Sequence, residues 1–172
     1  MPGTIYSHSR LQAYENCPLR YKYLYIDRLD RKRRDSIEAF MGNRVHETME
    51  RLYSDLNYAK INSFEELLAY YRSCWDKRWS DDIVIVREQY TPAHYRELDE
   101  RCIRGYYKRH HPFDRLRRLE LERPISITLP GRYRLTGVID RLAQHPDGAY
   151  AIHDYKTSET LPGQSDVDAD RQ

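Results

Sequence analysis

Two extended-type runs joined by a turn, residues 135–157, constrain the fold of this chain more than any other feature. Residues 135–142 are β-branched and apolar, a His-Pro-Asp-Gly turn follows, and residues 150–157 resume an extended pattern. Strand interiors normally avoid aspartate and lysine, but the two extended runs contain three such residues. They are Asp140, Asp154 and Lys156.

Side chains alternate along a strand, so Asp154 and Lys156 should project from one face, with Asp140 on the neighbouring strand. Both aspartates face the same side only if Asp140 pairs with an even-numbered residue of the second strand. Converging carboxylates repel unless they share a proton or a metal ion, and hard oxygen ligands favour Mg²⁺ or Mn²⁺. The pattern indicates a pocket that binds a divalent metal ion and also contains one fixed positive charge, the ammonium group of Lys156. The alternative is a surface hairpin with an Asp–Lys ion pair.

The part of the chain before residue 119 has the periodicity of helices. Apolar residues recur at three- and four-residue steps in residues 36–57, after the capping box at Ser63, and after Thr91. Two short helices are expected on either side of the boundary at Pro18. His46 lies at the edge of the apolar stripe of residues 36–57, where an imidazole emerges from the packed face. The alternative for His46 is a half-buried histidine with a backbone partner.

From residue 119 the periodicity becomes that of strands, with runs at 119–129, at 132–142 after the turn residues Pro130 and Gly131, and at 150–157. A helical N-terminal half followed by a three-stranded meander predicts an α+β fold. A length of 172 residues fits a single domain. We expect residues 1–118 to be the mainly helical part and 119–157 the active-site sheet, with residues 158–172 a loop leading into a truncated helix.

Charge and cysteine content restrict the function classes. The net charge is only +2, so nucleic-acid binding requires a local patch, such as the basic run at residues 31–34. The three cysteines, Cys17, Cys74 and Cys102, form no CxxC motif, which argues against a disulfide scaffold. No apolar run approaches the length of a membrane span and the first residues begin no signal peptide, so we expect a cytoplasmic protein without a membrane partner.

Four motifs occur together in one order along the chain. They are Ser-x-Ser…Cys-Pro…Tyr at the start, Gly42-x-x-x-His46, Gly137-x-x-Asp140, and Asp154-Tyr155-Lys156. With this set the chain resembles the PD-(D/E)XK nuclease superfamily, specifically its RecB-like branch, which includes RecB- and AddB-type nuclease domains and the CRISPR adaptation nucleases. The resemblance implies a restriction-endonuclease-like core in which the helix and strand that close the fold are truncated.

The resemblance also implies roles for individual residues. His46, Asp140 and Asp154 would bind Mg²⁺ or Mn²⁺, helped by the backbone carbonyl of Tyr155. Lys156 would position or activate the attacking water, which makes Asp140, Asp154 and Lys156 the catalytic set. The expected supporting residues are Glu122, Gly42 and Gly137.

Further expected contacts and cofactors come from the same resemblance. The expected DNA-binding residues are Arg31, Lys32, Arg33, Arg34, Arg141 and Gln172. Gln172 stands where the glutamine of a DNA-contacting QxxxY motif would fall. Cys17 would ligate a [4Fe–4S] cluster only if further cysteines lie beyond residue 172.

The function expected from the sequence is that of a metal-dependent, exonuclease-type deoxyribonuclease. It would act on DNA ends or single strands in DNA recombination, DNA repair or CRISPR adaptation, with a helicase or a recombination or CRISPR subunit as partner. The alternative is a non-catalytic nuclease-like module that binds DNA or docks to a helicase and is inactive as this fragment.

Overall fold

The computed structural model of the chain describes residues 5–29, 34–131 and 133–157. The chain divides into two compact units, of which the second comprises residues 34–122 and 140–161 and the first comprises the remaining segments. Two of the boundaries, after residues 122 and 139, fall inside strands, and each unit is described by itself. The single-domain organisation therefore stays a prediction.

The first unit begins with a short strand and the helices predicted around Pro18. Strand β1 (Ile5–Ser7) leads into α1 (His8–Asn16), which is followed by α2 (Pro18–Tyr21) and the π-helix η1 (Lys22–Ile26). The Ser7 side chain accepts a hydrogen bond from the Arg10 backbone and caps α1, which ends before Pro18 as predicted. Strand β1 was not expected. It forms because it pairs in parallel with β3, with Tyr6 opposite Leu135, a partner that local periodicity does not reveal.

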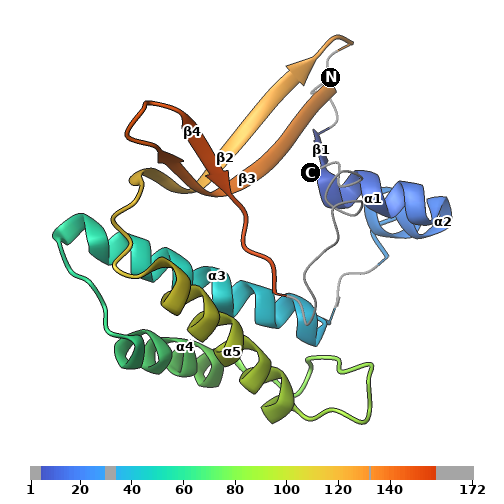
Figure 1. The fold of residues 1–172 in the computed structure, drawn as a ribbon. Helices are drawn as coiled ribbons and strands as arrows, with labels where there is room; N and C mark the ends of the chain where they lie inside the picture. The colour runs from blue at the N-terminus through green and yellow to red at the C-terminus, as the bar shows by residue number, and fades with distance from the viewer. Residues whose placement is uncertain (1–4, 30–33, 132, 158–172) are drawn as a thin grey trace. The chain divides into compact units, whose positions relative to one another are not determined.

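Three helices that lie side by side form the core of the second unit (Figure 1). They are α3 (Ile37–Asp55), α4 (Phe64–Arg78) and α5 (Pro92–His110), and the 3₁₀ turn η2 (Leu56–Tyr58) follows α3. Their buried apolar side chains include Phe40, Val45, Met49, Leu52, Tyr71, Trp75 and Ile103. The capping box at Ser63 is present, with reciprocal bonds to Glu66. The helical part of the prediction is confirmed.

The sheet contains β2 (Arg117–Leu129), β3 (Tyr133–Gln144) and β4 (Tyr150–His153) in addition to β1. Its order is β1-β3-β2, and β4 pairs with β3 in the antiparallel sense. Helices followed by a mixed sheet confirm the α+β class. In the β3–β4 hairpin Leu142 lies opposite Ile152. Even-numbered residues therefore face even-numbered residues, and the predicted register is confirmed.

Strand β4 is shorter than expected. The sequence pattern predicted an extended strand through residue 157, whereas β4 ends at His153 and the next residues leave the sheet. The reason is a competing hydrogen bond, since the Tyr155 N–H donates to the Asp140 carboxylate at 2.7 Å. Asp154 and Lys156 therefore do not share a strand face as predicted, because neither residue lies in a strand.

Several expected features lie outside the described residues. They are the basic residues Arg31, Lys32 and Arg33, the loop of residues 158–172, and Gln172. Among the helices that the structure does describe, none has both the length and the apolar composition needed to cross a membrane.

A buried carboxyl group in the helical core leads to a stability prediction. Asp99 on α5 is completely buried and accepts a hydrogen bond from the Tyr71 hydroxyl at 2.9 Å, while its Oδ1 has no partner among the described residues. Burial raises the pKa of Asp99 from 3.8 to about 7. The folded state thus retains a proton that the unfolded state loses, so this group lowers stability progressively as the pH rises from 3.8 to about 7.

Asp99→Asn should therefore stabilise the chain at pH 8, by about 2 kcal/mol or roughly 5 °C in Tm, because it removes the buried charge and keeps an acceptor for Tyr71. Near pH 4 the gain should vanish, because the native carboxyl is then already neutral. Thermal unfolding at both pH values measures the difference, and Glu97→Gln on the exposed face of α5 is the matched control. A loss of stability at pH 8 would contradict the prediction.

Candidate metal centre

Helix α3 places a half-buried imidazole beside the sheet of the second unit. Val45 packs in the core, and His46, one residue later, leaves the packed face as its position at the edge of the apolar stripe predicted. Gly42 and Gly137 were expected to support the site. A side chain at Gly42 would meet nothing within 4 Å, and one at Gly137 would make only an ordinary contact with Ile125 at 3.7 Å. Neither glycine is required by a close approach.

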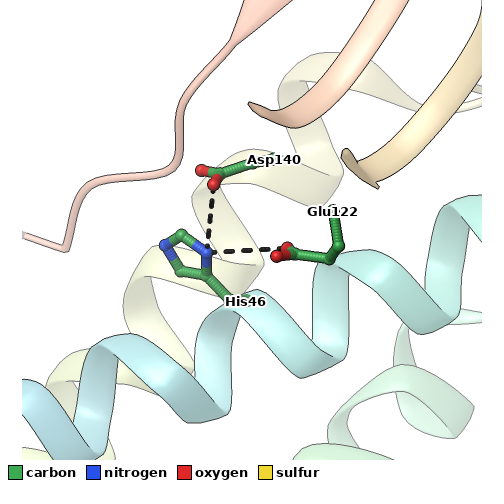
Figure 2. Close-up of side chains that lie close together, drawn as sticks. All are labelled: His46, Glu122 and Asp140. Carbon is green, nitrogen blue, oxygen red and sulfur yellow. Dashed lines mark ion pairs between the residues drawn. The ribbon is translucent and has the colours of Figure 1, made fainter. Parts of the chain in front are cut away.

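Two carboxylates converge on His46 from neighbouring strands (Figure 2). The Nδ1 atom of His46 lies 3.5 Å from Asp140 Oδ1 on β3 and 3.9 Å from Glu122 Oε1 on β2. One ligand-type atom from each of the three residues lies within 4.8 Å of the other two. An imidazole and two carboxylates at this separation are a donor set that fits a divalent cation.

Glu122 reaches this position through an unusual backbone conformation. Its φ of 46° lies in the left-handed region, although it is a non-glycine residue inside strand β2. Such a conformation costs of the order of 1 kcal/mol or more, and it persists only where surrounding contacts impose it. Strain of this kind is typical of functional sites, and here it coincides with a side chain that faces His46 and Asp140.

The electrostatics of the carboxylate pair favour a bound cation. Asp140 is only 7% exposed. Burial, and after it the charge of Asp140, raises the pKa of Glu122 above its usual range. The charge of Asp140 therefore opposes ionisation of Glu122, and a divalent ion between the two carboxylates would offset both the repulsion and the loss of solvation.

The backbone of Tyr155 orients two of the three side chains, His46 and Asp140, through hydrogen bonds. Its N–H donates to Asp140 Oδ2 at 2.7 Å, and its carbonyl oxygen lies 2.9 Å from Nε2 of His46. A carbonyl oxygen only accepts hydrogen bonds, so Nε2 must donate. In the neutral ring this leaves the lone pair of Nδ1 directed at Asp140 and Glu122. The Tyr155 carbonyl, which was expected to be a metal ligand, thus sets the tautomer of His46 in this structure, and its ligand role stays a prediction.

Asp154 does not belong to this group in the structure. Its carboxylate pairs with Lys156 at 2.9 Å, and the two side chains are 51% and 58% exposed. The structure brings together His46 and Asp140 as expected, and it adds Glu122, which the sequence had assigned only a supporting role. The signal for Glu122 was an acidic residue inside a strand, the same signal that singled out Asp140. The ligand role of Asp154 stays a prediction.

A metal-binding measurement tests whether Glu122 is a protein ligand in addition to Asp154. Glu122→Gln should lower the affinity for Mn²⁺ at least about tenfold, because it removes one of two carboxylates facing His46. Isothermal titration calorimetry without DNA measures the change, and Glu38→Gln on the exposed face of α3 is the matched control. If Glu122→Gln binds Mn²⁺ like the wild type and Asp154→Asn does not, the third ligand is Asp154.

The remaining predicted site residues differ in their exposure. Arg34 is exposed, which is compatible with a phosphate contact. Arg141 is only 3% exposed, and its guanidinium lies 4.1 Å from the centre of the Tyr53 ring, so it does not form part of an open basic surface. Cys17 is exposed and caps α2 weakly through its sulfur. A cluster-ligand role for Cys17 stays a prediction.

Comparison with known proteins supplies the family. No curated protein matches the chain. A family model described as the PD-(D/E)XK nuclease superfamily matches residues 5–172, which is nearly the whole sequence. That span includes His46, Glu122 and Asp140, the residues that the structure brings together, as well as the Asp154-Tyr155-Lys156 motif. The chain belongs to the PD-(D/E)XK nuclease superfamily.

Proposed function

We propose that the chain is a divalent-metal-dependent deoxyribonuclease of the RecB-like branch, acting on DNA ends or single strands. One observation carries the proposal, namely the convergence of His46, Glu122 and Asp140 within 4.8 Å in a chain of this superfamily. The superfamily implies metal-dependent nuclease activity with DNA as substrate. The branch, the exonuclease mode and a role in recombination, repair or CRISPR adaptation rest on the four sequence motifs.

The residues of the site would have two roles, which are to bind the metal ion and to stabilise negative charge on the phosphate. His46, Glu122 and Asp140, joined by Asp154, would hold Mg²⁺ or Mn²⁺. A bound ion of this kind lowers the pKa of a water molecule and polarises a phosphoryl oxygen. The Tyr155 peptide keeps His46 and Asp140 oriented through its two hydrogen bonds. Lys156 carries a positive charge beside Asp154, where it would stabilise negative charge that develops on the phosphate.

The cellular setting is proposed on the same basis. A cytoplasmic nuclease of this branch would work with a helicase or with a recombination or CRISPR subunit that presents DNA ends or single strands. A [4Fe–4S] cluster at Cys17 belongs to the proposal only for a longer protein that supplies three more cysteines.

The test is cleavage of end-labelled single-stranded and duplex DNA with Mg²⁺, with Mn²⁺, and with excess EDTA. We expect cleavage that requires metal and is faster with Mn²⁺, because an imidazole ligand suits Mn²⁺ better than Mg²⁺. Cleavage that persists in EDTA would place the chemistry elsewhere. Binding of DNA and of Mn²⁺ without any cleavage would favour the non-catalytic, DNA-binding alternative.

A further inference from the structure

A second candidate site lies in the second unit, on the face of strand β3 opposite to Asp140. Asp140 and Arg141 are consecutive strand residues, so their side chains leave opposite faces. Arg141 lines a pocket of about 310 Å³, which is at the small end of the range of ligand pockets. The nitrogen-bearing side chains that line it are Arg115, Arg141, His110, His145 and His153. None of its lining residues carries a carboxylate.

The arginine at the inner wall of this pocket is buried without a matching anion in the pocket lining. Arg141 is 3% exposed, packs on the Tyr53 ring, and has an Nε with no hydrogen-bond partner among the described residues. The residue opposite it in the hairpin is His153, whose Nε2 is likewise buried and without a partner in the part of the chain that the structure describes. Buried charged and polar groups are costly unless they are paired, so an unpaired guanidinium Nε beside an unpaired imidazole nitrogen points to a missing polar partner at this wall.

The other side chains of the pocket leave the positive charge uncompensated. Burial, followed by the charges of Arg109, Arg141 and Arg115, lowers the pKa of His110 below its usual range. Arg115 is exposed at the mouth, and Tyr53 contributes an aromatic ring to the lining. The geometry fits a compact oxyanion at the inner wall, because a planar guanidinium donates to phosphate oxygens in pairs.

We propose that this pocket is a phosphate-binding subsite, distinct from the metal centre, that takes the phosphate group of a nucleotide. The group comes either from a free nucleoside monophosphate or from the terminal phosphate of a DNA strand. The first source requires nothing of the metal centre. The second rests on the proposed function, because the metal centre on the opposite face of β3 would then act on the same strand.

Binding is measured on the metal-free chain in EDTA, so that failure of the nuclease proposal does not affect the result. Inorganic phosphate and thymidine monophosphate are titrated by calorimetry and by the NMR shifts of the histidine rings. Arg115→Gln should weaken both ligands about tenfold, since it removes a charge at the mouth without disturbing the interior. Arg117→Gln, an exposed arginine two residues later that does not line the pocket, is the matched control and should change nothing.

Arg141→Gln should abolish phosphate binding, and circular dichroism shows whether this variant is folded. If Arg141→Gln does not fold, Arg115→Gln alone tests the proposal. Oligonucleotides with and without a terminal phosphate separate the two sources. Preferential binding of the phosphorylated strand that is lost in Arg115→Gln identifies strand ends, and binding of thymidine monophosphate alone identifies the free nucleotide. The absence of phosphate binding by the wild type, or equal binding by Arg115→Gln and Arg117→Gln, overturns the proposal.

Discussion

Asp140→Asn should lower the rate of DNA cleavage about a thousandfold and weaken Mn²⁺ binding as well. Asp140 is buried, its Oδ1 lies 3.5 Å from His46, and its Oδ2 accepts from the Tyr155 N–H. Asparagine has the same shape but only one acceptor oxygen, so one of these two contacts is lost together with the negative charge. A loss of this size corresponds to about 4 kcal/mol of transition-state stabilisation.

The measurement is single-turnover cleavage of labelled DNA in saturating Mn²⁺, with Mn²⁺ affinity determined separately. Asp81→Asn, at an exposed turn of the second unit, is the matched control and should leave both quantities unchanged. Circular dichroism excludes unfolding as the cause. Cleavage by Asp140→Asn within tenfold of the wild-type rate would remove Asp140 from the active site.

Lys156→Ala should separate turnover from metal binding. Lys156 pairs with Asp154 at 2.9 Å, is 58% exposed, and is not a metal ligand. Its removal should therefore leave Mn²⁺ affinity intact or slightly raised, because the Asp154 carboxylate loses the ammonium group that it pairs with. The rate of cleavage should fall about a hundredfold, which is the typical cost, about 3 kcal/mol, of losing a positioned charge beside the transition state.

Two further variants make this prediction specific. Lys77→Ala, in the last turn of α4, removes the same charge from an exposed position and should leave cleavage at the wild-type rate. Lys156→Arg keeps the charge but changes its shape, so it should recover part of the activity. If Lys156→Ala loses metal binding in parallel with cleavage, the role of Lys156 is to hold the site together and not to stabilise charge.

Local sequence patterns were sufficient for the three long helices and for two members of the site. The boundaries of α3 and α4 follow from capping serines and apolar periodicity, which act within a few residues along the chain. Local patterns also predicted that His46 lies at the edge of the apolar stripe of its helix and that Asp140 lies within a strand. The hairpin register was predictable because a single turn connects β3 to β4, so only the parity of the pairing had to be chosen.

Tertiary structure decided the features that depend on residues far apart in the sequence. Glu122 joins His46 because β2 lies beside β3 and because its own backbone adopts a left-handed conformation, which no local pattern encodes. Strand β4 ends early because the backbone N–H and C=O of Tyr155 form hydrogen bonds with Asp140 and His46, which lie 15 and 109 residues away in the sequence. Arg141 packs against the ring of Tyr53 and is only 3% exposed, a burial that its position in the sequence does not reveal. In each case contacts made across the fold outweigh local propensities worth a fraction of a kcal/mol.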